Sequence, residues 1–303
     1  MSFNEVYITN TASYFPNSPV SNDEMEEYLG YINGQPSKSK RIVLRNNGIT
    51  NRYYALTKDR KITHTNAQIT AEAVKALLGN DAAKLKNIDL LSCGTSSPDQ
   101  VMPSHGVMVH GLLPEMNPIE VVSPAGVCCA GMHALKYAYL AIKTGDASLA
   151  VATGSERFSA LLVSDVFEDE AKKLKELEEN PYIGFEKEFL RWMLSDGAAA
   201  FLMTNKKNEN GLNLRVEWLE GFSFANEMEA CMYSASEKQK DGSLKGYMEY
   251  TPDEIMNRSI LSIKQDVKLL SEHIVPLGGV GLKAALDKHG VKSDEVDYFL
   301  PHM

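Results

Sequence analysis

Two adjacent cysteines, Cys128 and Cys129, are the residues in this chain best suited to covalent chemistry, and they make up half of its four cysteines. They lie in the stretch VVSPAGVCCAGMHAL, where a short apolar strand turns into a helical pattern that ends near Gly145. The N-terminal end of a helix carries a partial positive charge and unpaired N–H groups, which stabilise a thiolate and lower the pKa of the thiol. Because the neighbouring residues are small, a substrate carbonyl could approach the backbone there and accept hydrogen bonds from it.

Position alone leaves two interpretations of the doublet open. One sulfur acts as a nucleophile, or both cysteines pack as small hydrophobic residues. Adjacent residues point about 100° apart on a helix, so at most one can face a given pocket, and the pair is poorly placed for a disulfide. Zinc sites need a second, spaced pair of Cys or His residues, which the doublet lacks. We therefore predict no metal or redox site here, and we expect Cys93 and Cys231 to be unreactive.

Several ionisable residues are expected to have structural roles. His105 and His110 are five residues apart, which does not match the i, i+4 spacing of a helical metal site. His133 lies one turn after the doublet and is expected to pack. Glu156 and Asp196 are expected to satisfy buried backbone groups or a dimer interface rather than to transfer protons.

The composition limits the class of protein. The 303 residues include 31 Lys and Arg against 40 Asp and Glu, a net charge of −9, which argues against a general binder of nucleic acid or of an anionic membrane. The sequence has neither a signal-peptide pattern nor an apolar run near the roughly 20 residues that span a bilayer. Four cysteines in a chain of this length do not make a disulfide framework. We therefore expect a cytoplasmic enzyme with reduced thiols.

Alternating apolar runs and helical patterns predict an α/β fold that positions the doublet. Capping boxes mark two helix starts, at Ser21 with Glu24 and at Thr65 with Gln68. The charged stretch 166–181 is expected to be a helical excursion on the surface. Strands are expected within 5–16, 88–94, 119–123, 148–156 and 196–205, and helices within 21–30, 65–79, 128–144 and 253–270.

A weak internal sequence repeat predicts a duplicated α/β unit. Residues 73–94 resemble residues 281–302, since each segment has a helix, a polar turn and an acid-containing strand. The match makes Cys93 and His302 pseudo-equivalent and predicts a strand at 296–299. After that strand the chain stops, and a buried strand without covering elements would expose a sheet edge. We therefore expect the second half to be truncated.

The segment CCAGMHAL resembles the nucleophile segment of the β-ketoacyl-ACP synthase III group of the thiolase superfamily, in which a Cys precedes Ala-Gly at the start of a buried helix. The match makes Cys129 the nucleophile and places Cys128 at a position usually held by a small residue. It makes His302, in the Pro-His of GVKSDEVDYFLPHM, the catalytic histidine. Residues 21–49 are similar to the subgroup that builds dialkylresorcinol and aryl-polyene lipids. Further motifs of the family follow in the expected order as RIVLRNNGITNRYYA, GTSSPDQVMPSHG, VATGSE and SDGAAAFLM.

This resemblance implies a thiolase-like fold, a duplicated α/β unit in αβαβα layers, with the nucleophile in residues 1–207 and an incomplete second half in residues 208–303. It implies a Claisen condensation in fatty-acid or polyketide-type lipid biosynthesis by a homodimer. Cys129 takes an acyl group from a CoA or acyl carrier protein thioester, and His302 hydrogen-bonds the thioester oxygen of the enolate. The family needs no cofactor beyond these phosphopantetheine thioesters. Its third catalytic residue, an Asn downstream of Pro-His, is not in this sequence, so we expect inefficient condensation.

Differences from the family bear on the substrate. Arg41 stands where a Trp often stacks on the adenine of CoA, which favours carrier-protein donors over CoA. Met102 stands where an aromatic residue often lines the acyl pocket across the dimer, although packing in the core explains this Met at least as well. Gly131 is assigned to the same pocket. Arg258 and Lys264 are the candidates for docking an acidic carrier protein, although a merely solvated helix face is the favoured explanation for them.

Two other functions stay open. A Cys and a His suffice for transthioesterification, so the chain can also be an acyl-thioester hydrolase or a simple acyltransferase. Alternatively, it is a non-catalytic partner subunit of a ketosynthase.

Overall fold

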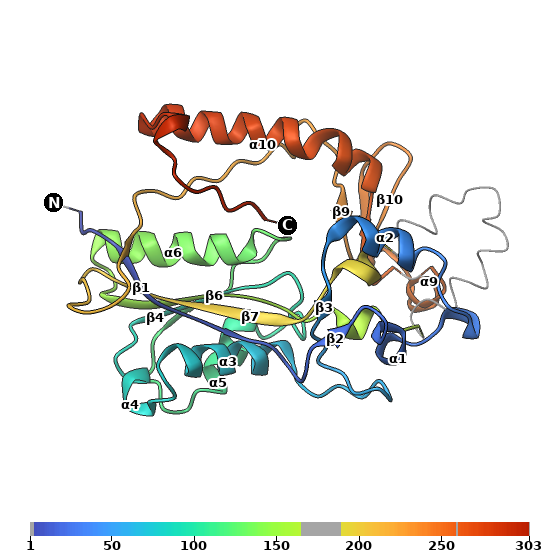
Figure 1. The fold of residues 1–303 in the computed structure, drawn as a ribbon, viewed down its shortest axis with the longest axis horizontal. Helices are drawn as coiled ribbons and strands as arrows, with labels where there is room; N and C mark the ends of the chain where they lie inside the picture. Colours follow the sequence, from blue (N-terminus) through green and yellow to red (C-terminus); the bar gives the residue numbers. More distant parts are fainter. Residues whose placement is uncertain (1–2, 165–188, 259, 303) are drawn as a thin grey trace. The chain divides into compact units, whose positions relative to one another are not determined.

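The computed structural model describes residues 3–164, 189–258 and 260–302. They form two compact units, Met1–Glu217 and Trp218–Met303 (Figure 1). The stretch 166–181, expected to be a charged surface helix, lies outside the described residues. The assignment of residues 1–207 and 208–303 as the two halves of a duplicated fold stays a prediction.

A six-stranded mixed sheet forms the centre of the first unit. The strand order is β5-β4-β6-β7-β1-β8, in which β4 runs parallel to β5 and β6, and the other neighbours pair antiparallel. Five of these strands lie where apolar runs predicted them. The strands are β1 (Tyr7–Tyr14), β4 (Leu90–Gly94), β5 (Glu120–Val122), β6 (Leu149–Glu156), β7 (Gly197–Thr204) and β8 (Leu214–Arg215).

Helices cover both faces of this sheet. Figure 1 shows α6 (Ala130–Thr144) on one face, and α3 (Asn66–Leu77) with α5 (His105–Gly111) on the other. Buried Val74 of α3 and Val109 of α5 belong to the main hydrophobic core, which lies against the strands. The shorter elements of this unit are β2 (Val20–Ser21), α1 (Met25–Leu29), η1 (Ile32–Gly34), α2 (Lys40–Asn47), β3 (Asn51–Arg52), α4 (Ala82–Leu85) and η2 (Ser159–Leu161).

Local signals set the bounds of the two long helices. Thr65 and Gln68 form the predicted capping box at the start of α3. Gly145, in the left-handed conformation with φ +85°, ends α6 as expected. The predicted start of α3 and the predicted end of α6 are therefore confirmed.

The helix expected over 21–30 is shorter than predicted. The Ser21 hydroxyl and N–H both donate to the Glu24 carboxylate, at 2.6 and 3.1 Å. This pair closes a turn ahead of the helix, so α1 begins only at Met25. The predicted end is correct, because Gly30 follows the helix with φ +80°.

The second unit contains two small two-stranded sheets and one long helix. β9 pairs with β12, and β10 pairs with β11, both antiparallel. Among the described helices, none is long and apolar enough to cross a membrane. The elements are β9 (Met232–Tyr233), β10 (Ser236–Lys238), β11 (Leu244–Gly246), η3 (Tyr247–Glu249), α9 (Pro252–Asn257), β12 (Lys264–Gln265), α10 (Val267–His289) and η4 (Ser293–Glu295).

The prediction of a continuous helix over 253–270 is wrong. α9 ends at Asn257, and Lys264 lies in β12, opposite Tyr233 of β9. A new helix then begins where Asp266 caps α10 by accepting a hydrogen bond from the Leu269 N–H at 2.9 Å. Strand pairing and a new N-cap therefore determine the structure of this segment, although the spacing of its apolar side chains is typical of a helix.

The strand expected at 296–299 is also absent from the described structure. This segment follows η4 without regular secondary structure, and Tyr298 and Phe299 are exposed. A strand needs a neighbouring backbone to complete its hydrogen bonds, and this segment pairs with none of the described strands. The predicted truncation of the second half stays a prediction.

Candidate active site

Cys129 occupies the N-cap position of α6 with an exposed thiol. Its carbonyl accepts the His133 N–H at 3.0 Å, the first step of the helical ladder, and its side chain makes no capping hydrogen bond. Cys128 lies in the preceding turn and is also exposed. The helix begins at Ala130, two residues later than the expected start at 128, and Cys129 lies at its N-terminal end as predicted.

Three glycines allow the first turn of α6 to lie directly against the sheet. A Cβ added to Gly94, the last residue of β4, would be 2.1 Å from the carbonyl oxygen of Ala130. A Cβ added to Gly131 would be 3.1 Å from the Cα of Gly154 in β6. Larger residues would push the start of α6 outward. Gly131 therefore has a packing role, while its assignment to an acyl pocket stays a prediction.

The loop after β4 supports the segment that leads to Cys129. The Thr95 N–H donates to the Pro124 carbonyl at 3.3 Å, and Thr95 forms a parallel bridge with Ala125. Glu156, at the end of β6, accepts hydrogen bonds from the Ser96 N–H at 2.8 Å and from the Ser97 hydroxyl at 2.6 Å. The expected role of Glu156 as an acceptor for backbone groups is confirmed.

Asp99 is a structural residue that the sequence did not indicate. Its carboxylate accepts the N–H groups of Asn66 and Ala67 at the start of α3, at 2.8 and 2.9 Å, and it pairs with Arg157 at 3.2 Å. A carboxylate at a helix N-terminus is favourable because it meets unpaired N–H groups. The only sequence signal was an acidic residue in a Ser-Pro-Asp loop, since its partners are more than 30 positions away.

His105 and Asp196 have the structural roles expected of them. The buried His105 Nε2 lies 3.2 Å from the hydroxyls of Thr70 and Ser155, and burial lowers the pKa of its imidazole to about 4. Asp196 accepts the Ala55 N–H at 2.7 Å, and burial raises the pKa of its carboxyl. Both side chains are enclosed by their own unit.

Two other predictions about single residues have different outcomes. Burial raises the pKa of the Cys93 thiol to about 12, which agrees with an unreactive cysteine. His133, expected to pack, is exposed instead. The reason is its position on the solvent side of α6, since Ala134 and Leu135 carry the buried side of that turn.

His302 and Met102 remain predictions as site residues. His302 lies in the second unit, exposed, in the segment after η4, whereas Cys129 lies in the first unit. Met102 is 82% exposed in the loop between β4 and α5. Their roles toward Cys129 rest on the resemblance alone.

The two candidate docking cations have partners within their own unit. The Arg258 guanidinium pairs with Glu237 and lies over the ring of Tyr250. The Lys264 ammonium donates to the carbonyls of Ser236 and Ile260, at 3.1 and 3.4 Å. These contacts give both side chains an internal role, and carrier docking by them stays a prediction.

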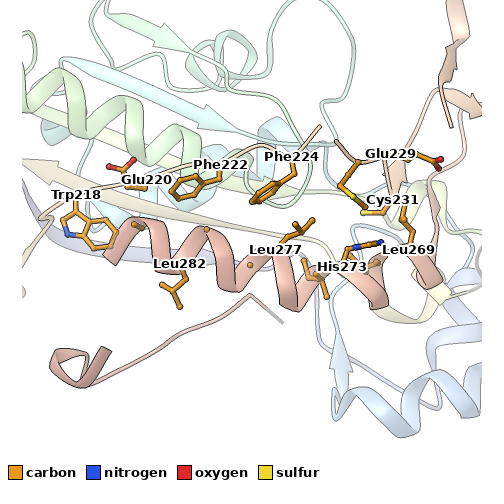
Figure 2. A pocket seen from close by; sticks show the side chains of 16 residues that line it. Trp218, Glu220, Phe222, Phe224, Glu229, Cys231, Leu269, His273, Leu277 and Leu282 are labelled. Carbon is orange, nitrogen blue, oxygen red and sulfur yellow. The ribbon is translucent and has the colours of Figure 1, made fainter. Parts of the chain in front are cut away.

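A cavity of about 540 Å³ lies within the second unit, between the segment 218–231 and α10 (Figure 2). Its lining is mainly aromatic and aliphatic, with Phe222 and Phe224 facing Leu277. Cys231 also lines it. Among the described residues, no cluster of three His, Cys, Asp or Glu side chains could hold a metal ion.

No protein-family model matches the chain. In sequence, it is 28% identical over 155 residues to the "Beta-ketoacyl-[acyl-carrier-protein] synthase III" of Neisseria gonorrhoeae (strain NCCP11945), a match that covers 51% of this chain and 45% of that protein. It is 22% identical over 295 residues to the protein of the same description from Ehrlichia ruminantium (strain Gardel), covering 97% of this chain and 76% of that protein. The chain thus spans about half the length of the Neisseria relative that it matches.

A solved structure shows the fold. The tetronic acid condensing enzyme AbyA1 superposes with a TM-score of 0.69 at 18% identity, covering 97% of this chain and 76% of that chain. The chain therefore has an α/β, thiolase-like fold with a mixed sheet and flanking helices. Together with the sequence matches, this confirms the predicted likeness to β-ketoacyl-ACP synthase III. The dialkylresorcinol subgroup stays a prediction.

Proposed function

We propose that this homologue of the β-ketoacyl-ACP synthases III is a condensing enzyme that uses Cys129 to accept acyl groups from carrier-bound thioesters. The observation that supports this most is the position of Cys129. Its thiol is exposed at the N-terminal end of a 15-residue helix whose first turn is fixed against β4 and β6 by glycines.

The first step is a transthioesterification. The Cys129 thiolate attacks the carbonyl carbon of the acyl thioester, and the negative oxygen that forms accepts hydrogen bonds from backbone N–H groups. The bond between the acyl carbon and the carrier sulfur then breaks. The carrier leaves as a thiolate and takes up a proton, and the acyl group stays on Cys129.

The second step forms the carbon–carbon bond. A malonyl-type thioester loses CO2, or a β-ketoacyl thioester loses a proton, and His302 donates a hydrogen bond to the resulting enolate oxygen. The carbanion attacks the acyl group on Cys129, the carbon–sulfur bond breaks, and the thiolate is regenerated. We assign His302 to this role from its place in the Pro-His motif.

The proposal also includes the oligomeric state of the protein and the cell compartment in which the reaction takes place. We infer a homodimer in which Met102, 82% exposed in this chain, lines the acyl pocket of the second copy. Its flexible thioether suits a long or bent acyl chain. The cysteine content of the chain fits the reducing cytoplasm, where fatty-acid and polyketide-type synthesis supplies acyl carrier protein thioesters.

Intact-mass spectrometry tests the first step. Incubation with an acyl-N-acetylcysteamine thioester is expected to add the mass of one acyl group to the chain, and Cys129→Ala is expected to prevent this. A chain that stays unmodified is a non-catalytic partner subunit. An adduct that releases only free acid when a malonyl thioester is added identifies a hydrolase. Either result refutes the proposed function.

A further inference from the structure

Two consecutive residues at the end of β4 hold both ends of the segment that carries the adjacent cysteines. Gly94 lies so close to Ala130, the residue after the cysteines, that an added Cβ would be 2.1 Å from its carbonyl oxygen. Thr95 holds the other end, because its N–H donates to the Pro124 carbonyl at 3.3 Å and it forms a parallel bridge with Ala125. The position of both thiols, and of the backbone N–H groups beside them, therefore depends on the end of β4.

The Thr95 side chain is buried and uses its full hydrogen-bonding capacity. Its hydroxyl accepts the Ser97 N–H at 3.1 Å and one N–H of the Asn66 amide at 2.9 Å, and it donates to the Glu156 carboxylate at 3.4 Å. A threonine hydroxyl has one donor and two acceptor lone pairs, and all of them are used here. These three hydrogen bonds fix the orientation of the Thr95 side chain.

Asn66, the first residue of α3, is the partner of Thr95 that lies outside this loop. It is fully buried, and its amide donates a second N–H to the Ser97 carbonyl at 2.8 Å. Because a carbonyl oxygen only accepts, this contact sets the orientation of the amide and directs the other N–H at Thr95. The Asn66 Oδ1 has no hydrogen-bond partner among the described residues, and a buried acceptor without a partner is destabilising. The two donated hydrogen bonds, rather than packing, therefore account for an amide at this position.

We propose that Asn66 is a positioning residue for acyl transfer to Cys129. Because Asn66 is buried, it acts through Thr95, whose orientation it fixes beneath the segment that leads to Cys129. That segment in turn sets the position of the backbone N–H groups that donate to the negative oxygen formed during acyl transfer. A displacement of about 1 Å in such groups lowers the rate roughly a hundredfold. The inference rests on the proposed function, since it concerns the acylation of Cys129.

Acylation and alkylation of the same thiol together test this inference. Asn66→Ala removes both donated hydrogen bonds. With an acyl-N-acetylcysteamine thioester, followed by intact mass, we expect the limiting rate of acylation to fall by about tenfold or more, while KM stays within about twofold of wild type. Alkylation of Cys129 by iodoacetamide forms no negative carbonyl oxygen, so its rate, followed by peptide mapping, should stay within about twofold. A merely structural defect would not separate the two reactions.

Two substitutions of Thr95 test the path through its hydroxyl. Thr95→Val keeps the shape of the side chain but removes the hydroxyl, and we expect the same fall in the limiting rate of acylation. Thr95→Ser keeps the hydroxyl and should retain most of the wild-type rate. Because both residues act through one contact, the double variant Asn66→Ala, Thr95→Val should be about as slow as Thr95→Val alone. The comparison of Val with Ser decides the question if Asn66→Ala does not fold.

Gln68→Ala is the matched control in the same helix start. The exposed Gln68 accepts the Thr65 N–H at 2.8 Å in the capping box of α3, and none of its hydrogen bonds in the described structure reaches Thr95. We expect this variant to lower the urea midpoint of unfolding, because it removes half of the capping box. Its acylation of Cys129 should stay within about twofold of wild type.

Four outcomes overturn the assignment of Asn66. Asn66→Ala or Thr95→Val acylates at the wild-type rate, or alkylation falls as much as acylation. In the third case Gln68→Ala slows acylation equally, which assigns the effect to the stability of α3. In the fourth the losses of Asn66→Ala and Thr95→Val multiply in the double variant, so that the two residues act independently. A wild-type chain that no thioester acylates refutes the proposed function instead, so the two failures are distinguishable.

Discussion

Cys129 and His302 lie in contrasting surroundings. Cys129 begins a 15-residue helix that is seated on Gly94 and Gly154, with hydrogen bonds from the neighbouring loop behind it. His302 is exposed in a segment without regular secondary structure. Under the proposed function, the segment that carries the nucleophile is therefore held in place within its own unit, whereas no regular element among the described residues holds His302.

The largest expected effect comes from filling the glycine contact beneath Cys129. Gly94→Ala places a Cβ 2.1 Å from the backbone carbonyl of Ala130, which cannot move without shifting the start of α6. We expect a loss of about 3 kcal/mol or more in the free energy of unfolding, measured with urea, and loss of acylation at Cys129.

Gly111→Ala is the control for this prediction. Gly111 ends α5, and an added Cβ would meet nothing within 4 Å. We expect its effect to stay within about 1 kcal/mol and to be stabilising, because Ala is the better helix former. Equal losses in the two variants would show that the close approach beneath Cys129 is unimportant.

The second-largest effect is expected from the loop after β4, which Glu156 holds in place next to the segment that leads to Cys129. Glu156→Gln keeps the size of the side chain but replaces one acceptor oxygen with an NH2 group, which cannot accept from Ser96 or Ser97. We expect a loss of about 2 kcal/mol in unfolding free energy and slower acylation. The exposed Glu115→Gln should change neither. An unchanged Glu156→Gln variant would contradict the supporting role of this loop.

Stability should also depend on pH through His105. Its pKa is about 4 in the folded chain and 6.5 in the unfolded chain, so the unfolded state binds the proton more readily. The contribution is fully present above pH 6.5 and is lost as the pH falls toward 4. Between pH 7 and pH 5 we expect unfolding free energy to fall by about 2 kcal/mol from this residue.

Urea unfolding at several pH values checks this dependence. His105→Gln is expected to remove the slope between pH 6.5 and 4, while the exposed His133→Gln should retain it. A slope that is the same in wild type and His105→Gln would assign the pH dependence to other groups.

The smallest effect is expected at His302. Because the side chain is exposed, His302→Ala should leave unfolding free energy within about 0.5 kcal/mol of wild type. Acylation of Cys129 should stay within twofold, since His302 is assigned to the second step. A tenfold fall in the rate of acylation would show that His302 already acts on Cys129 in the first step. It would contradict the assignment of the two residues to separate steps.

Local patterns predicted the first unit well because its elements are fixed by local signals. The box of Thr65 and Gln68 begins α3, and Gly145 ends α6, and both act within one helical turn. Apolar alternation indicated the strands of the sheet because each strand buries one or both faces. The position of Cys129 at a helix start followed from the same kind of local information.

Features that depend on distant contacts were not predictable. Lys264 pairs in a strand with a segment about 30 residues earlier, so its helical spacing was misleading. Arg258 meets Glu237 across 21 positions, and Asp99 meets the start of α3 across more than 30. The sequence alone does not show which of these charges pair with one another, so the internal partners of Arg258 and Lys264 could not be predicted, and carrier docking by them stays a prediction.

The most direct test of the account is to locate the acyl group. After reaction with an acyl thioester, digestion and peptide mapping should find the adduct on Cys129, and Cys128→Ala should acylate at the wild-type rate. Because both thiols are exposed, exposure alone does not favour either one. An adduct on Cys128, or one that survives in Cys129→Ala, would contradict the assignment of Cys129 as the nucleophile.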